Sequence, residues 1–334
     1  MDRLVAGRAD PPGCTIGLLG DVMLGRCVGA RLAQDRAPPV WGEDLRRLTR
    51  SLDVVVANLE CCLAMGGRPT RRIAGKPYFF RGPRSATAPL TELGISVAGV
   101  ANNHALDYEE WALGETLAVL DDAGIAVSGA GRGLVSARSP AVVTAAGTRI
   151  GVVAFSDHPV EYAATEDGLG IAYADLRREV PNWLRDALAR LRESCDVVIA
   201  FPHWGPNMAP DPQPWQRPRA EELQQAGAQL VAGHSAHVFH GVSWSDRGPI
   251  LTDLGDALDD YRVDCDLRND LGILAIWRPG AEGDELELVG LRLRFAFTDL
   301  ARDADADWID RRLRQACGPL YVERVADQHF RISP

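Results

Sequence analysis

The sequence predicts a layered α/β fold, and three observations support this prediction. Apolar runs typical of strands alternate with helical segments through most of the chain. The runs are dense in apolar residues on both faces, as expected for strands that are covered on both sides. Several of them end in polar residues, at the strand ends where open α/β sheets carry their sites.

The first half of the chain alternates between the two kinds of segment. Helices are expected near 26–35 and 43–51, in SATAPLTELG (85–94), which ends in a glycine, and in the amphipathic EEWALGETLAVLDDAGI (109–125). Strands are expected in TIGLLGD (15–21) and LDVVVANLE (52–60). Three further segments each begin as a strand: KPYFFRGP (76–83) ends in a Gly-Pro turn, ISVAGVANNHALDY (95–108) runs into polar residues, and AVSGAGRG (126–133) ends in a glycine loop.

The second half continues the pattern, beginning with a hairpin through AAGTR in PAVVTAAGTRIGVVAFSDH (140–158). Further strands are expected in CDVVIAFPHWG (195–205) and QLVAGHSAH (229–237), and near 249–254, 271–277 and 285–297. Helices are expected in VPNWLRDALARLRES (180–194), RPRAEELQQAGA (217–228) and WIDRRLRQACG (308–318).

The 334 residues are long for one domain but within reach of a single large α/β unit. No linker long enough to separate two domains is present. We therefore expect one domain at 14–300, a flexible tail at 1–13, and a helical extension at 301–334 packed on the same domain.

The amino-acid composition limits which partners the protein is expected to bind and in which cellular compartment it is expected to lie. With 36 Lys and Arg against 46 Asp and Glu, the formal net charge is −10, which argues against nucleic acid as a partner. Seven cysteines without a C-x-x-C pair indicate reduced thiols in a cytoplasmic protein. No apolar run of about 18 residues and no secretory signal is present, so no membrane segment is expected.

Side chains that bind metals recur at the ends of the predicted strands. They are Asp21, Glu60, Asn103, His104, His203, His234 and His237. Carboxylate, amide and imidazole groups together suit Mn²⁺, Fe²⁺ or Zn²⁺. Because a carboxylate can bridge two ions, the set predicts a site for one or two divalent metals.

Each residue also has a structural interpretation. Asp21 after a glycine could cap a helix, Glu60 could be solvated, and His203 could be a core histidine. His234 and His237 are more specific, because two imidazoles three residues apart after a strand that ends in glycine suit ligation.

The segments GDVMLGR, ANLE, KPYFFRGP, ANNHALDY, FPHWG, GHSAHVFHGV and LGDALDDYRVDCDLRNDLGIL, in this order, resemble the CapA family, named for poly-γ-glutamate capsule synthesis. That family belongs to the calcineurin-like metallophosphoesterase superfold, and the resemblance covers residues 15–300. It implies a four-layer sandwich, with two packed β-sheets flanked by helices and a two-metal centre at the strand ends.

The resemblance also implies roles for individual residues. Asp21 matches the metal aspartate of the first strand, and Glu60 falls where the superfamily has a bridging aspartate. Asn103 would be a ligand and His104 the proton donor, so that His104 and Asp21 are the expected catalytic residues. The later histidine ligands match His203, His234 and His237.

The chain departs from the superfamily at three places. Met23 stands where a ligand histidine is usual, so one ligand is missing. Ser235 and Ala236 replace a His-Pro pair. Asp256 stands where many relatives have asparagine, and it is a substitute ligand, a base, or a structural acceptor for Arg268.

Residues expected to face the substrate lie in the same motifs. They are Lys76, Arg81, Trp204, His240 and Asp256. Lys76 and Arg81 are suited to grip a carboxylate or a phosphate, although solvated charges at strand ends would look the same. His158 at the end of a strand is a further pocket candidate or a surface residue.

The leading functional hypothesis is a metal-dependent enzyme that hydrolyses an amide or phosphoester in a peptide-like or poly-γ-glutamate-like substrate. Metal-activated water would attack, and His104 would protonate the leaving group. The alternatives are a metal-assisted epimerase of a ribosomal peptide, of the lasso-peptide type, and a non-catalytic subunit of capsule polymer synthesis or export. The oligomeric state is left open.

Overall fold

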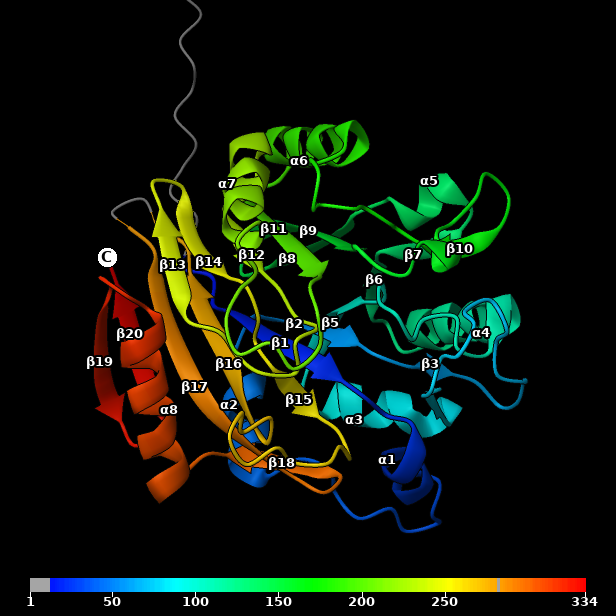
Figure 1. The fold of residues 1–334 in the computed structure, drawn as a ribbon, viewed down its shortest axis with the longest axis horizontal. Coiled ribbons are helices and arrows are strands. Elements are labelled where there is room, and N and C mark those ends of the chain that lie inside the picture. The colour runs from blue at the N-terminus through cyan, green and yellow to red at the C-terminus, as the bar shows by residue number, and fades with distance from the viewer. Residues whose placement is uncertain (1–12, 281–282) are drawn as a thin grey trace, which may run out of the picture.

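The computed structural model describes residues 13–280 and 283–334, and the expected tail at 1–13 lies outside this range except for Gly13. Two large sheets pack face to face and helices cover their outer faces, which confirms the predicted α/β class with its two packed sheets (Figure 1).

The larger sheet has ten strands. Its order is β19 (Tyr321–Ala326), β20 (His329–Ser333), β17 (Glu285–Arg294), β16 (Leu271–Arg278), β1 (Ile16–Val22), β2 (Val54–Leu59), β5 (Ile95–Gly99) and β6 (Ala126–Ser128), with β15 (Asp256–Leu258) paired to β1 and β18 (Phe297–Leu300) to β17. The run from β1 through β2 and β5 to β6 is parallel.

The smaller sheet has six strands in the order β13 (Val242–Ser245), β14 (Gly248–Leu251), β12 (Leu230–Ala232), β11 (Val197–His203), β9 (Thr148–Ser156) and β8 (Ala141–Ala145). Strands β9, β11, β12 and β14 are parallel to one another. Two short ribbons pair β10 (Leu169–Ile171) with β7 (Ala130–Arg132), and β3 (Cys62–Leu63) with β4 (Arg81–Gly82).

Helices form the outer layers. The larger sheet is covered by α2 (Glu43–Arg50), the 3₁₀ turn η1 (Arg84–Ala86) with α3 (Thr87–Glu92), and α4 (Glu109–Asp122), and the smaller sheet by α6 (Asn182–Ser194) and α7 (Gln216–Ala226) (Figure 1). The remaining helices are α1 (Arg26–Leu32), α5 (Leu134–Ala137), η2 (Val160–Tyr162) and α8 (Asp303–Ala316). Within the described residues, none of these helices has the length and apolar character needed to cross a membrane.

The alternation of side chains along the strands explains why the apolar runs are nearly continuous. In β1, Ile16 and Leu18 pack between the two sheets, whereas Leu19 packs toward the outer helices. In β11, Ile199 lies between the sheets and Val198 lies under the helices of the smaller sheet. Both faces of each central strand are therefore buried, as in other sheets covered by helices on both sides.

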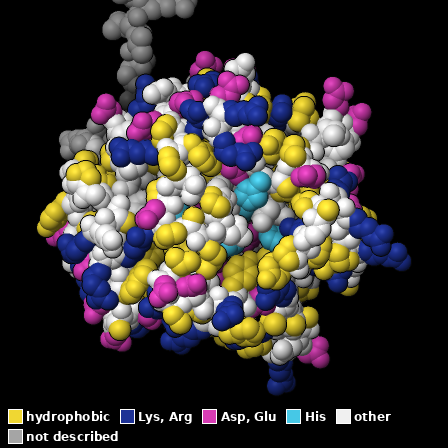
Figure 2. Space-filling model, viewed as in Figure 1, with side chains coloured by type: hydrophobic (Ala, Val, Ile, Leu, Met, Phe, Trp, Pro, Cys, Tyr) yellow, Lys and Arg dark blue, Asp and Glu magenta, His cyan; other side chains and the backbone are white. Residues whose placement is uncertain are grey.

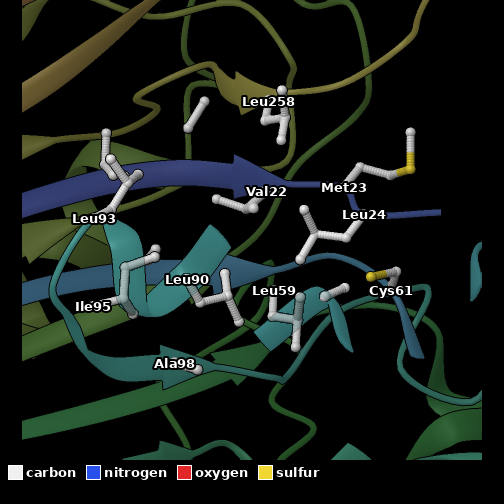
Figure 3. Close-up of a cluster of buried hydrophobic side chains, with 14 of the residues drawn as sticks. Val22, Met23, Leu24, Leu59, Cys61, Leu90, Leu93, Ile95, Ala98 and Leu258 are labelled. Atoms are coloured by element: carbon white, nitrogen blue, oxygen red, sulfur yellow. The ribbon is translucent and has the colours of Figure 1, made fainter. Parts of the chain in front are cut away.

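Met23 belongs to the cluster between the larger sheet and its helices. Figure 3 shows it at the end of β1 beside Leu24, in the cluster that also holds Leu59 and Leu90. The side chain is fully buried, and its sulfur accepts a hydrogen bond from the backbone N–H of Gly25 at 3.0 Å. Position 23 is thus used for packing.

Three segments differ from the sequence expectations. The strand expected in 76–83 is limited to β4, because the chain before Arg81 forms no ladder. The strand expected at 285–297 is two strands, β17 and β18. The extension at 301–334 is only partly helical, since α8 is followed by the β19–β20 hairpin, which lengthens the larger sheet.

Candidate metal centre

The parallel strands of the two sheets bring polar side chains to one end of the sandwich. Asp21 lies near the end of β1 and stands opposite Asp256 in the register of β15. Glu60 follows β2 directly, and His203 is the last residue of β11. A β-bridge pairs His203 with His234, which follows β12. Residues far apart in sequence thus meet where strands of both sheets end.

Close backbone packing fixes this junction. A Cβ on Gly20 would lie 1.9 Å from the carbonyl oxygen of Gly255, so only glycine allows β1 to lie this close to the segment before β15. The backbone N–H of Asp21 donates to the same carbonyl at 3.2 Å. The positions of Asp21 and Asp256 relative to each other are therefore set by the main chain.

Two groups of potential ligands share Asp21. The first group is Asp21, His203 and His234, and the second is Asp21, Glu60, His237 and Asp256, with the ligand atoms of each group within 4.8 Å of one another. Oδ1 of Asp21 lies 3.0 Å from Nδ1 of His234, whereas Oδ2 lies 3.7 Å from Nδ1 of His237. One oxygen of Asp21 therefore faces each group.

The donor set fits divalent cations. Ligands bound to one ion at about 2.1 Å lie roughly 3 to 3.5 Å apart, which is close to the separations seen here. Several polar atoms of the expected ligands are buried without a hydrogen-bond partner in the described part of the chain; they are Oε1 of Glu60, Oδ1 of Asn103, Oδ2 of Asp256 and Nε2 of both His203 and His234. Orphaned polar atoms of this kind are costly unless something else binds them.

The pKa values of the buried carboxyl groups also support a cation site. Burial, together with the neighbouring Asp21 carboxylate, raises the pKa of Glu60 well above its ordinary value. Burial and then the charge of Asp259 raise the pKa of Asp256 in the same way. Burial alone would also raise the pKa of Asp21, but His234 and His203 beside it hold this pKa well below its usual range. Several buried carboxyl groups in one place create a deficit of positive charge that a cation would relieve.

A shell of amides orients Asp21. The side-chain amide of Asn58 donates to Oδ1 of Asp21 at 2.7 Å, and the backbone N–H of Ser235 donates to Oδ2 at 3.1 Å. Asn102 in turn donates to the side-chain oxygen of Asn58 at 3.1 Å and to the carbonyl of Leu59 at 2.8 Å. Asn58 was missed in the sequence because it lies inside an apolar strand run.

His104 lies beside the second group and is held by Asp107. Its Nδ1 is 2.5 Å from Oδ2 of Asp107, and its ring stacks on Phe80 with centroids 3.9 Å apart. Its Nε2 faces the centre, 4.0 Å from Oε1 of Glu60. Burial lowers the pKa of His104 to about 4, although Asp107 opposes this shift.

Asp107 also binds Lys76 and Tyr162. Nζ of Lys76 lies 3.2 Å from Oδ1 of Asp107 and donates to the backbone oxygen of Asn103 at 2.8 Å, while the Tyr162 hydroxyl donates to the same Oδ1 at 3.1 Å. Lys76 is therefore bound within this loop, and its expected contact with substrate stays a prediction. Asp107 was not singled out from the sequence, although it stands three residues after His104, within one motif.

Asn103 directly precedes His104 in the chain. Its Oδ1 is buried without a partner, as stated above, which is compatible with the expected ligand role. Ligation by Asn103 stays a prediction.

Two of the expected substrate contacts are packing residues. Trp204 is fully buried in the cluster under α6 and α7, and its indole N–H donates to the carbonyl of Thr252 at 2.8 Å. His240 is 4% exposed, and its ring nitrogens lie 3.0 Å from the Thr252 hydroxyl and 2.9 Å from the carbonyl of Ala209. Neither side chain has a polar atom left for a substrate, so these two expectations are corrected.

Asp256 belongs to the ligand group and not to Arg268. Its Oδ1 lies 2.8 Å from Nδ1 of His237. Arg268 instead pairs with Asp270 at 2.7 Å and with Asp305 at 2.6 Å. The possibility that Asp256 is an acceptor for Arg268 is therefore wrong, and Asp256 lies instead among the potential metal ligands.

His158 lies between the buried His203 and the surface of the protein. Its ring centroid is 5.2 Å from that of His203, it pairs with Asp157, and its side chain is 34% exposed. Figure 2 shows histidine side chains reaching the surface near the middle of this face. The guanidinium of Arg81 lies 4.5 Å from the ring centroid of Tyr108.

All seven cysteines lie in the described part of the chain and none is paired, as expected for free thiols.

The chain is similar to known proteins over most of its length. A family described as "Bacterial capsule synthesis protein PGA_cap" matches residues 15–261. A Mycobacterium tuberculosis (strain CDC 1551) protein described as a probable polyglutamine synthesis accessory protein is 31% identical, over 90% of each chain. The PGA biosynthesis protein CapA of Bacillus subtilis (strain 168) is 25% identical over 72% of this chain and 62% of its own.

Similarity to solved structures is lower. The crystal structure of a hypothetical protein from Thermus thermophilus covers 85% of this chain and 95% of its own, with 18% identity and a TM-score of 0.41.

Proposed function

The chain belongs to the PGA_cap family of bacterial capsule synthesis proteins, which includes the CapA proteins, and we propose on this premise that it is a metal-dependent hydrolase of a poly-γ-glutamate-like chain. The bond cleaved is an amide of the polymer backbone. The observation that carries the proposal is the position of Asp21, whose two oxygens face two separate groups of buried ligands.

The residues that would hold the ions are Asp21 with His203 and His234, and Asp21 with Glu60, His237 and Asp256. The resemblance assigns the bridging role to Glu60, but only Asp21 is common to both groups. A bound divalent ion would supply Lewis acidity, which polarises a carbonyl and lowers the pKa of water.

His104 is the residue suited to move a proton. Because the Asp107 carboxylate can only accept a hydrogen bond while ionised, it holds a proton on Nδ1 of His104 and leaves Nε2 free. Nε2 faces the ligand groups, so it is placed to take a proton from an attacking water and to pass it to the leaving amine. Stacking on Phe80 keeps the ring in this orientation.

The proposal is tested with protein purified without chelator. Its metal content is measured by elemental analysis, and release of new amine ends is followed with poly-γ-glutamate, glutamate peptides and a generic phosphoester, with Mn²⁺, Fe²⁺ or Zn²⁺ added. We expect cleavage of the glutamate polymer that is lost in Asp21→Asn and His104→Asn proteins.

Two outcomes would redirect the proposal. Deuterium uptake from heavy water into an intact peptide, without new amine ends, would favour the epimerase. No turnover of any amide or ester, together with unchanged capsule production by an Asp21→Asn strain, would favour a non-catalytic accessory role.

A further inference from the structure

A broad hollow opens on the surface next to the proton-transfer pair. It has a volume of about 920 Å³ and is lined by Arg68 and Arg71 of the β3–β4 loop and by Tyr108 and Trp111 at the start of α4. The hollow is not part of the metal centre, since none of the ligands lines it.

A second hollow of about 400 Å³ also borders Trp111 and is lined by Arg132 at the end of β7. Trp111 lines both hollows and is 56% exposed. Because the two hollows share this side chain, we treat them together as one track along the start of α4.

The arginines of this track have no partner to neutralise them. Across residues 13–280 and 283–334, Arg68, Arg71 and Arg132 form no ion pair, whereas the neighbouring Arg72 pairs with Glu109 at 3.1 Å and Glu110 at 2.6 Å. The third acidic residue that lines the hollows, Glu115, pairs with Arg84 at 3.5 Å. Each of the three acidic side chains therefore already has an arginine partner outside the set of Arg68, Arg71 and Arg132. The two hollows therefore carry local positive charge on a chain whose formal net charge is −10. In Figure 2, Lys and Arg side chains project at the right-hand edge, on the side where Figure 1 places α4.

Main-chain bonds connect the track to the proposed active site. The backbone N–H of Thr70, between the two arginines of the loop, donates to the carbonyl of Asp107 at 2.8 Å. Tyr108 follows Asp107 directly, and Arg81 covers its ring while donating to the carbonyl of Gly67 at 3.4 Å. A chain lying in the track would therefore pass beside the loop that holds His104.

We propose that this track, with Arg68 and Arg71 in one hollow, Arg132 in the other and Trp111 in both, binds an extended, carboxylate-rich polypeptide and guides it to the metal centre. The inference rests on the proposed function and names the part of the substrate that lies outside the reacting bond. Guanidinium groups pair with carboxylates through two parallel hydrogen bonds. The indole of Trp111 offers a flat apolar surface for the methylene groups of glutamate side chains.

The test measures binding of a fluorescently labelled poly-γ-glutamate oligomer by anisotropy. The metal-loaded His104→Asn protein is used, so that the oligomer is not consumed. The Arg68→Glu/Arg71→Glu, Arg132→Glu and Trp111→Ala changes are compared with Arg190→Glu, which alters an exposed arginine in a separate hollow on α6. We expect at least tenfold weaker binding for the double variant, several-fold weaker binding for the other two, and no change for Arg190→Glu.

Failure of the track and failure of the proposed function give different results. Unchanged binding in the double variant, or equal competition by polyphosphate or an oligonucleotide, would overturn the track. Polymer cleavage with a KM unaffected by these changes would overturn the track and leave the function standing. If the variants bind the oligomer more weakly but the unaltered protein cleaves no polymer, the track stands and the proposed hydrolase function is overturned. Unchanged melting temperatures of the variants exclude misfolding as the cause.

Discussion

Nδ1 of His104 and Oδ2 of Asp107 lie 2.5 Å apart, and this pair directs the other ring nitrogen of His104 toward the ligand groups. Replacing Asp107 by asparagine removes the charge that fixes the tautomer, although the side chain keeps its shape. We expect kcat of Asp107→Asn to fall by roughly 10²-fold or more, the range in which positioned acid–base groups act.

Metal content of the Asp107→Asn protein should stay at the level of the unaltered protein, because Asp107 belongs to neither ligand group. Tyr162→Phe is the matched control, since its hydroxyl binds the other oxygen of Asp107. It should lower kcat much less. A fall in metal content that accounts for the lost activity would contradict a role through His104.

The shared position of Asp21 predicts an asymmetry among the ligand variants. Asp21→Asn removes a donor from both groups, whereas His234→Ala weakens only the group with His203 and Glu60→Gln only the group with His237 and Asp256. Elemental analysis should therefore find metal lost from both sites in Asp21→Asn and from one site in each of the others. Equal losses in all three proteins would argue against two groups that share one carboxylate.

Removal of metal should destabilise the fold. Without a cation, the pKa of Glu60 is raised by burial and by Asp21, and orphaned polar atoms remain in the interior. A ligand present at about a thousand times its Kd stabilises the native state by roughly 4 kcal/mol. The melting temperature should accordingly drop by several degrees with a chelator and recover with added Mn²⁺ or Zn²⁺. An Asp21→Asn protein should show little response to either treatment.

The burial of His240 should make the free energy of unfolding depend on pH, without an effect on activity. Burial lowers its pKa from 6.5 to about 4. The unfolded state therefore binds the proton more readily, so stability is full above pH 6.5 and is lost as the pH falls toward 4, by on the order of 3 kcal/mol. Urea unfolding of the His240→Asn protein should show a shallower dependence over this range. Since the side chain is packed against Thr252 and Ala209, KM should not change.

Placing at position 23 the histidine that is usual in the superfamily which the chain resembles should not create a better metal site. Met23 is fully buried among apolar side chains, and Asp256 with His237 already supplies donors to the second group. Met23→His should destabilise the protein by about 1–3 kcal/mol, because it buries a polar ring in an apolar cluster. Met23→Leu should cost less than about 1.5 kcal/mol. An increase in metal content or activity in Met23→His would show that this side chain reaches the ions.

Much of the fold could be predicted from the sequence because its signals are local. The run from Ile16 to Asp21 is apolar on both faces, and that pattern is typical of a central strand wherever it occurs. The polar residues that follow such runs were predicted for the same reason, as Glu60 and His203 show. Short elements gave no such signal, and the three residues of β15 that present Asp256 were not expected as a strand.

The sequence by itself determined which residue types stand at the ends of the strands, and it therefore determined that carboxylates and imidazoles are available for a metal. Only the tertiary structure decided how they are grouped. The pairing of β1 with β15 sets Asp256 beside Asp21, and the burial of Trp204 and His240 removes both from the site. The physical reason is that burial periodicity is written into consecutive residues, whereas strand pairing and the face on which a side chain lies depend on segments that are hundreds of residues apart.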